Sequence, residues 1–436
     1  METIGIYSFF ILCFTSHSTV QSIGLEDEFT WSRINYTWPE DTFLESELGS
    51  EETAGSNFSF NISTTVKTSG ETLTTVFVDY QYANNIPVGL HVWGNKLFVT
   101  VPRRKPGVPS TLNYVPLHST IKHNVPLIPY PNWNINLYPD TSGNGDNLVS
   151  IYRIAIDTCD RMWFVDTGIY DIVGSYTHVK QLELILINLQ NDEIIHRVTV
   201  PNDVIISGTV FTSLTIDVSN QSCNKAFAYF PDLVAYKLIV YSLEANRFWR
   251  VKHNYFYLES TAGDVSINGY NFQWTDGVFS VELSEEKPDG FKDMYFHALA
   301  GTHMFNVSTM ILQNETLATR NYHGNDLTIV GDKGPKTHTS MADIHPSSGI
   351  MFLNFVNQNA VGCWNSQKSL DTISIVHKDD TKMIYPADVK VSGDRVYVFT
   401  NQMPILTIDN LDNDDVNFRV WSNTVEDAVK DTNCAL

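Results

Sequence analysis

The chain repeats one two-strand unit six times, and this repetition restricts the fold more than any other feature of the sequence. Each copy has an apolar strand, a tight polar turn and a second strand rich in aromatic and β-branched residues. The copies are VGLHVWGNKLFVTV, YRIAIDTCDRMWFVDTG, LTIDVSNQSCNKAFAYFPD, GVFSVELSEEKPDGFKDMYFHAL, SMADIHPSSGIMFLNFV and ADVKVSGDRVYVFTNQ. Their starts lie roughly 45 to 65 residues apart, which is enough for a four-stranded blade and a loop. The pattern predicts an all-β, six-bladed β-propeller. A pair of β-sandwiches is the alternative, but it gives no reason for equivalent strand pairs.

The two ends of the repeat region predict how the ring closes. After the last copy only one good strand remains, around VNFRVW, so the sixth blade lacks an outer strand. Residues 72–82, TLTTVFVDYQY, precede the first copy and have no blade of their own. We therefore expect this N-terminal strand to complete the last blade and remove an open sheet edge.

Three segments are expected along the chain. Residues 1–22 hold an apolar run, Ile4 to Phe14, followed by TSHSTVQS, which is typical of a secretory signal peptide and too short to span a bilayer. Residues 23–70 are acidic and rich in Ser, Thr and Asn, which predicts an exposed, glycosylated extension. Residues 71–436 form the predicted propeller.

Sequons and cysteines favour a secreted, extracellular glycoprotein. Six Asn-x-Ser/Thr triplets begin at Asn35, Asn57, Asn61, Asn220, Asn306 and Asn314. With Cys13 in the predicted signal peptide, four cysteines remain, and of their three possible connectivities we predict Cys159–Cys223 and Cys363–Cys434. The first pair lies in the turns of consecutive copies. The second would tie the C-terminal tail to the ring.

Charge restricts the class of partner. The chain has 28 Lys and Arg against 49 Asp and Glu, a formal net charge of −21, so nucleic acid and anionic membrane surfaces would be repelled. A small cationic ligand is an easier partner. No long apolar run follows the predicted signal peptide, and we expect no membrane span.

Several segments resemble the recurrent motifs of the insect Yellow and major royal jelly protein family. They are VPRRKPGVPSTLNYV, RIAIDTCDRMWFVDTG, LIVYSLEANRFWRV, FQWTDGVFSVELS, NQNAVGCWN and VNFRVW, in the family's order. The resemblance implies a secreted six-bladed propeller with a role in cuticle pigmentation, catecholamine metabolism, saliva or nutrition. Some members convert dopachrome, and some salivary members bind biogenic amines. Arg104 stands where the family commonly has Trp, and Phe248 replaces a usual Ser, so a relative's substrate does not transfer directly.

Ligands of propellers usually bind where the inner strands begin, so polar residues at those positions are the candidates. The predicted ligand-binding residues are Asp276, Thr339, Ser340, Phe352, Asn354 and Asp388, with Ser150 and Ser213 at equivalent positions. A carboxylate there could hold a protonated amine, and an aromatic side chain could cover the ligand ring. Turn or strand-capping roles are the alternative for the Asp and Asn residues.

Dopachrome conversion would need a base and an oxyanion donor, and His91 or a desolvated Asp276 is the candidate base. No histidine pattern indicates a metal site and no cofactor is predicted, although a lactonase-like cation site at Asp276, Asn354 and Asp388 is a minor alternative.

We expect a secreted protein that binds an aromatic amine or catechol-derived molecule. The alternatives are a dopachrome-converting isomerase and a non-catalytic structural or nutritional protein. Arg103 and Arg104 are interpreted as loop residues that pair with carboxylates.

Overall fold

The computed structural model describes residues 24–39, 43–45, 59–67, 73–138, 145–206, 209–219, 222–405, 412 and 414–435. The predicted signal peptide and the sequons at Asn57 and Asn220 lie outside these residues.

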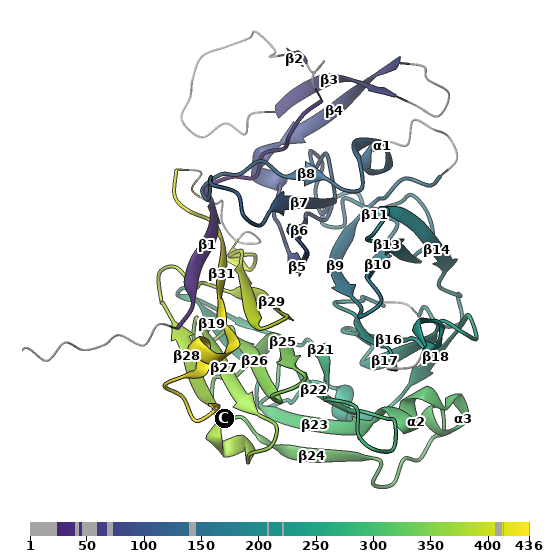
Figure 1. Cartoon of the computed structure of the whole chain (residues 1–436), viewed down its shortest axis with the longest axis vertical. Coiled ribbons are helices and arrows are strands. Elements are labelled where there is room, and N and C mark those ends of the chain that lie inside the picture. The colour runs from purple at the N-terminus through teal and green to yellow at the C-terminus, as the bar shows by residue number, and fades with distance from the viewer. Residues whose placement is uncertain are drawn as a thin grey trace, which may run out of the picture.

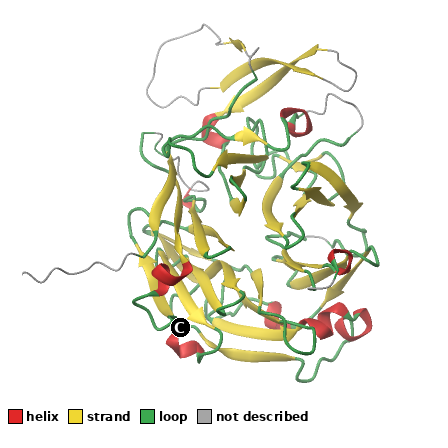
Figure 2. Ribbon diagram, viewed as in Figure 1, coloured by secondary structure: helices red, strands yellow, loops and turns green. Residues whose placement is uncertain are grey.

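Six four-stranded antiparallel sheets form a ring, which confirms the predicted six-bladed β-propeller (Figures 1 and 2). Blade one contains β5 (Gly89–Trp93), β6 (Lys96–Thr100), β7 (Leu112–Pro116) and β8 (Ile128–Pro129). Blade two contains β9 (Ile151–Ile156), β10 (Arg161–Asp166), β13 (Glu183–Asn188) and β14 (Glu193–Thr199). Blade three contains β15 (Thr215–Asp217), β16 (Phe227–Asp232), β17 (Lys237–Ser242) and β18 (Arg247–Val251).

The other three blades have the same order from the inner strand outward. Blade four contains β21 (Val278–Leu283), β22 (Asp293–Ala298), β23 (His303–Ser308) and β24 (Leu327–Asp332). Blade five contains β25 (Thr339–His345), β26 (Ile350–Phe355), β27 (Ala360–Asn365) and β28 (Ser374–Lys378). Blade six contains β29 (Pro386–Ser392), β30 (Arg395–Thr400), β31 (Phe418–Thr424) and β1 (Glu26–Trp31). The inner strands β5, β9, β15, β21, β25 and β29 contact one another in a closed circuit.

The remaining strands and the helices lie outside the six blades. The additional strands are β2 (Phe43–Glu45), β3 (Ser59–Lys67), β4 (Leu73–Gln81), β11 (Ile169–Tyr170), β12 (Thr177–His178), β19 (Asp264–Ile267) and β20 (Tyr270–Gln273). The α-helices are α1 (Trp133–Asn136), α2 (Thr309–Gln313), α3 (Glu315–Ala318) and α4 (Val425–Val429). In the described part of the chain, none of the helices has the length and apolar character needed to cross a membrane.

The second strands of the blades are apolar on both faces because each sheet is packed between two neighbours. In β10, Met162 and Phe164 belong to the core shared with blade one, whereas Trp163 and Val165 belong to the core shared with blade three. All four side chains are buried. This packing explains why the repeat reads as continuous apolar runs rather than as a simple alternation.

An N-terminal strand does complete the last blade, but it is not the one predicted. β1 pairs with β31 from Glu26↔Ser422 to Trp31↔Phe418, and Phe29 and Trp31 fill the core between blades one and six. The segment predicted to close the ring, residues 72–82, instead contains β4, which pairs along nine residues with β3. That local hairpin satisfies the backbone of β4 without a long-range closure. β1 lies within the segment predicted as an extension.

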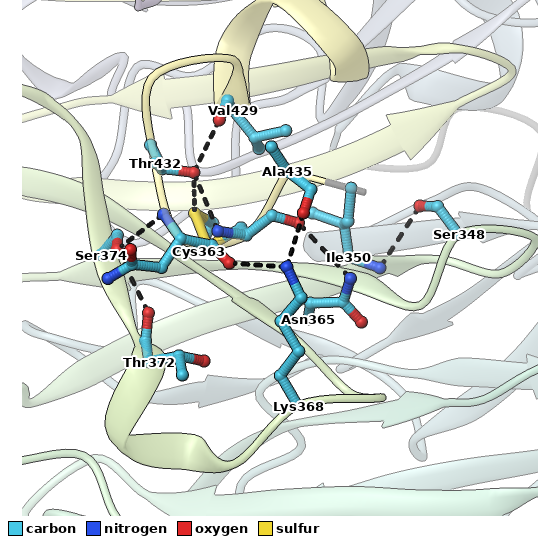
Figure 3. Close-up of a disulfide and its surroundings, with 12 residues drawn as sticks. Ser348, Ile350, Cys363, Asn365, Lys368, Thr372, Ser374, Val429, Thr432 and Ala435 are labelled. Atoms are coloured by element: carbon cyan, nitrogen blue, oxygen red, sulfur yellow. Dashed lines mark hydrogen bonds between the residues drawn. A yellow bond between two sulfur atoms is a disulfide. The ribbon is translucent and has the colours of Figure 1, made fainter.

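Both predicted disulfides are present. Cys159–Cys223 joins blades two and three, and Cys363–Cys434 ties the tail to blade five. Around the second bond, the Lys368 ammonium donates to the carbonyl oxygens of Asn433 and Ala435 at 3.0 and 2.6 Å (Figure 3). The C-terminal tail is therefore held by a covalent bond and by local hydrogen bonds.

Candidate functional site

We call the end of the ring at which the six inner strands begin the top end. Because the strands are antiparallel, the loops between second and third strands, and those between consecutive blades, lie at this end. The β11–β12 hairpin belongs to the first kind of loop, and the β19–β20 hairpin belongs to the second. Most of the predicted ligand-binding residues lie near this end.

Three tyrosines in the top-end loops have left-handed backbones. Tyr176, Tyr236 and Tyr385 have φ angles of 49°, 54° and 52° and come from blades two, three and six. A bulky residue rarely adopts this conformation, and such strain gathers at binding and catalytic sites. The observation marks the top end as a candidate functional site, independently of the sequence motifs.

Tyr385 lies at the centre of this site. Its side chain is fully buried, and its hydroxyl has no hydrogen-bond partner among the described residues. Burial raises the pKa of Tyr385 to about 12, the Asp276 carboxylate adds to this, and the guanidinium groups of Arg153 and Arg104 oppose it. These charged groups from three different loops or strands therefore act on one hydroxyl group.

Arg153 forms the floor of the site. Its guanidinium donates to the carbonyl oxygen of Thr212 at 2.9 Å and to that of Ala387 at 2.7 Å, so it spans from blade two to blades three and six. Its carbon centre lies 5.3 Å from the ring centroid of Phe279 in blade four. A single buried cation thus links four of the blades across the ring.

Arg104 extends from the loop after β6 toward the same place. It hydrogen-bonds to Tyr152, whose pKa is raised by burial and lowered by this guanidinium and by Arg153. Arg104 is only partly buried. Its positive charge is therefore partly accessible to solvent and close enough to Tyr152 to lower the pKa of that hydroxyl.

Asp276 is the anionic group of the site. Its carboxylate accepts a hydrogen bond from the Trp274 indole at 2.5 Å, and the Trp274 ring is stacked on Tyr385 with centroids 6.1 Å apart. Burial raises the pKa of Asp276, and the Trp274 hydrogen bond opposes the rise. A half-buried carboxylate beside two aromatic rings can accept a proton or pair with a cation.

Asn354 is the most unusual of the other predicted residues. It is fully buried at the end of β26, and neither its amide oxygen nor its nitrogen has a hydrogen-bond partner among the described residues. Leaving both atoms unsatisfied would cost roughly 2 to 6 kcal/mol. The opposite strand begins at Thr339, whose hydroxyl donates to Thr337 at 2.8 Å.

Three other predicted ligand-binding residues have partners within the protein. The Ser340 hydroxyl donates to the carbonyl oxygen of Pro386 at 2.7 Å, and Phe352 lies in the core between blades five and six. Asp388 is fully buried and accepts the backbone N–H of Leu90 at 2.9 Å, which joins blade six to blade one. Asp388 also lies 3.9 Å from Nε of Arg153, so it adjoins the floor of the site, whereas the contacts of Ser340 and Phe352 lie within the protein core and backbone.

The two candidate bases are in different environments. His91 lies further along its inner strand, beside Lys390, and burial together with that ammonium lowers its pKa to about 3. Its ring is therefore neutral, and it does not belong to the group around Tyr385. Asp276 does belong to that group.

Another buried acid lies on the inner strand of blade four. The Ser280 hydroxyl donates to one carboxyl oxygen of Glu282 at 2.5 Å, and the other oxygen has no partner among the described residues. Burial raises the pKa of Glu282 to about 8. Among the described residues, no group of three or more His, Cys, Asp or Glu side chains is arranged to hold a metal ion.

Among the residues that the structure describes, Arg103 has no ion pair with a carboxylate, contrary to the interpretation of Arg103 and Arg104 as loop residues that pair with carboxylates. Its fully buried guanidinium donates to five backbone carbonyl oxygens, those of Val108, Pro109, Asn136, Leu148 and Val149. It fastens the loop after β6 to the segment that enters blade two. The two adjacent arginines thus have different surroundings: Arg103 is enclosed by carbonyl groups, and Arg104 is partly exposed near Tyr152.

Sequence reasoning did not select Arg153, Tyr152, Trp274 and the three tyrosines with left-handed backbones. Arg153 lies within the apolar sequence of β9, and a charged residue in such a strand is ordinarily predicted to face solvent. Positive φ at a tyrosine has no sequence signal, since glycine and asparagine are the residues that indicate it. Only FQWTD, which carries Trp274 and Asp276, was singled out, and then as a family motif.

The fold and this site define a six-bladed propeller with a strained, aromatic and charged cluster at its top end. Residues 149–434 match a sequence model of the family described as "Major royal jelly protein". The chain belongs to this family, which includes the Yellow proteins, as the motifs predicted.

Two curated relatives from Drosophila melanogaster match most of the chain. The protein named "L-dopachrome tautomerase yellow-f" is 38% identical over 362 residues, which cover 82% of this chain and 83% of the relative. "Protein yellow" is 33% identical over 417 residues, which cover 94% of this chain and 71% of the relative. A solved structure of selenomethionine-substituted virginiamycin B lyase from Staphylococcus aureus covers 78% of this chain and 96% of its own, with 10% identity and a TM-score of 0.42. That likeness is too distant to inform function.

Proposed function

We propose that the top-end site binds a catechol-derived molecule that carries a carboxylate, and that it catalyses a proton shift on that molecule. The observation that carries the proposal is the group in which the Asp276 carboxylate accepts from Trp274, the Trp274 ring stacks on Tyr385, and Arg153 donates to Ala387 two residues beyond Tyr385. Arg104, Arg153 and Asp276 all influence the pKa of the Tyr385 hydroxyl. Arg153 lies 3.9 Å from the Asp388 carboxylate, whereas Arg104 is partly exposed, so Arg104 is the cation best placed to pair with an anionic ligand. The similarity to a protein named L-dopachrome tautomerase supports the same chemistry.

The proposed reaction needs no oxidant. L-dopachrome is an ortho-quinone fused to a ring that bears a carboxylate, and its tautomerisation to the dihydroxyindole carboxylic acid breaks two C–H bonds and forms two O–H bonds, one pair in each of two successive proton shifts. Asp276, with a raised pKa, would accept the proton from carbon. Arg104 would pair with the substrate carboxylate, while Tyr385 and Arg153 would donate to the quinone oxygen as it gains negative charge.

A second candidate is amine binding without turnover. The Asp276 carboxylate lies beside the Trp274 indole and the stacked Tyr385 ring, which is an arrangement that suits an aromatic ammonium ligand. The two disulfides and the family membership support a secreted protein, and a role in pigmentation is consistent with either activity.

The test compares turnover with binding. Loss of the visible absorbance of L-dopachrome is followed with and without the purified protein, and dopamine and serotonin are titrated calorimetrically. Acceleration that is weaker for the methyl ester of L-dopachrome supports the carboxylate-directed reaction. Saturable heat from the amines without any acceleration supports the carrier, and neither signal would leave a structural or nutritional protein.

Matched variants locate the site. Asp276→Asn should abolish the acceleration, whereas Asp289→Asn should not, because Asp289 is exposed in the turn at the other end of blade four. If the protein binds amines without turning them over, Asp276→Asn and Thr339→Ala should also weaken amine binding. Equal activity of both Asp variants would reject Asp276 as the base.

A further inference from the structure

The β19–β20 hairpin packs over Tyr385 at the top end of the ring. Val265 and Ile267 of β19 belong to the same buried apolar cluster as Tyr385. Trp274, which follows β20, stacks on the Tyr385 ring. The hairpin lies in the connection from blade three to blade four, whereas Tyr385 directly precedes the inner strand of blade six. The hairpin therefore reaches across the top end from a distant blade and contributes to the burial of Tyr385.

The two faces of the hairpin differ. Val265 and Ile267 are 3% and 1% exposed, whereas Asp264 and Ser266, which alternate with them along β19, are exposed. Among the described strands, β19 and β20 pair only with each other. The apolar face and a few polar contacts therefore hold the hairpin on the ring. An isolated two-stranded hairpin is only marginally stable, so these contacts are among the easiest of the fold to break.

Asn357, in the turn between β26 and β27 of blade five, is a polar anchor of the hairpin. Its side-chain oxygen accepts the backbone N–H of Ser266 at 3.1 Å, and its amide nitrogen donates to Nδ1 of His338 at 2.7 Å. Nε2 of His338 in turn donates to the carbonyl oxygen of Ala262, just before β19, at 2.7 Å. Blade five and the segment that enters it thus restrain a hairpin that precedes blade four.

A cavity of about 840 Å³ adjoins the hairpin. Asp264, Ser266 and Gln273 of the hairpin line it, together with Thr302 of blade four and Asn357 of blade five. The hairpin is therefore packed closely against the Tyr385 cluster but borders open space beside the loops of blades four and five. This space leaves room for the hairpin to move without displacing a blade.

The site can act on a ligand only if this cover moves. Tyr385 is 0% exposed, and its hydroxyl oxygen is buried, so a molecule from solvent cannot contact that group while the hairpin is docked. From this burial and the adjoining space, we infer that the β19–β20 hairpin is a lid that lifts from Tyr385 to admit the ligand, and that Asn357 stabilises its closed position. The inference rests on the proposed function, which supplies the reason for access to Tyr385.

Thiol labelling of the folded, full-length protein measures the opening without any ligand. Ala387→Cys places a thiol in the apolar cluster beneath the lid, and Ala228→Cys places one in the core between blades two and three. Both alanines are 0% exposed, and the cysteines in the described part of the chain form disulfides. With DTNB as the reagent and the wild type as background, Ala387→Cys should react at least roughly tenfold faster than Ala228→Cys, because local opening needs less free energy than global unfolding.

Asn357→Ala tests the anchor. Loss of its hydrogen bonds should speed the labelling of Ala387→Cys roughly fivefold to thirtyfold and leave that of Ala228→Cys unchanged. Gln358→Ala is the matched control, because Gln358 lies in the same turn and donates to the carbonyl oxygen of Lys336, outside the hairpin, at 3.1 Å. Equal protection of the two introduced thiols, or equal labelling rates in Asn357→Ala and Gln358→Ala, would overturn the inference.

Stopped-flow binding of L-DOPA, followed by tryptophan fluorescence, connects the lid with the ligand. If opening precedes binding, Asn357→Ala should raise the association rate by the same factor as the labelling rate. An unchanged association rate, beside faster labelling, would mean that the hairpin opens but does not control access, and the inference would again be overturned. If L-DOPA does not bind to the wild type, the proposed function fails, whereas the labelling rates still decide whether the hairpin opens.

Discussion

Arg103 provides the sharpest test of how the top-end loops are held. Its guanidinium donates to five carbonyl oxygens, with distances of 2.8 Å to Val108, Leu148 and Val149 and 2.6 Å to Pro109. Arg103→Lys keeps the positive charge but supplies only three N–H donors. At least two of the five carbonyl groups must therefore lose their partner.

The cost follows from those lost hydrogen bonds. Arg103 is 1% exposed, so water cannot replace the missing donors without rearrangement of the loop. Each unsatisfied buried acceptor costs about 1 to 3 kcal/mol, so we expect Arg103→Lys to lower the free energy of unfolding by about 2 to 6 kcal/mol. That is a large fraction of the stability of a typical domain.

Urea unfolding monitored by tryptophan fluorescence measures this loss, and Arg104→Lys is the neighbouring control. Arg104 is partly exposed, so its substitution should change the free energy of unfolding by less than about 1 kcal/mol. If Arg103→Lys is no less stable than Arg104→Lys, the five hydrogen bonds from Arg103 to carbonyl oxygens do not stabilise the loop after β6. The assignment of different roles to the two arginines would then be wrong.

Three further predictions concern the site, the tail and the buried acid. If Asp276 is the base, dopachrome conversion should be lost as the pH falls through its raised pKa, and a pH–rate profile of Asp276→Asn should show at least roughly a hundredfold lower rate throughout. Replacing Cys363 and Cys434 with Ala opens a loop of separation 71, and chemical denaturation should show a loss of about 4 kcal/mol. Glu282 has a folded pKa of about 8 against an ordinary value of 4.5, so it holds its proton longer in the folded state and stability should fall as pH rises from 4.5 to 8. Glu282→Gln should flatten that fall in thermal unfolding measured across this pH range.

The sequence predicted the features of the fold that repeat. Each blade carries the same strand pair, so the number of blades followed from the copies, and the positions of Cys159 and Cys223 in adjacent turns led to the correct disulfide. The closing strand was misassigned because β4 has the stronger strand sequence, while the choice between a local hairpin and a distant edge depends on contacts that a sequence does not display.

The site was harder to predict because it is made of unique loop residues. Asp276 was selected since it precedes an inner strand, and the structure places it beside Tyr385. Arg153 and Tyr385 were missed. The side chain of Arg153 extends from an inner strand to contact other blades, which a strand sequence does not indicate. The position of Tyr385 depends on a left-handed backbone conformation that a tyrosine in the sequence does not predict. For Asn354, the sequence suggested a binding or turn role, and its two unpartnered atoms are visible only in three dimensions.

The pairing of β1 with β31 also orders the events of biosynthesis. β1 leaves the ribosome well before its distant partner β31 is made, so the last blade stays incomplete for roughly 20 to 80 seconds at 5 to 20 residues per second. During that interval the apolar side chains of Phe29 and Trp31 lack the core that later buries them. A nascent chain of this protein therefore depends on a folding factor, or on early docking elsewhere, to keep its first strand available until its last one arrives.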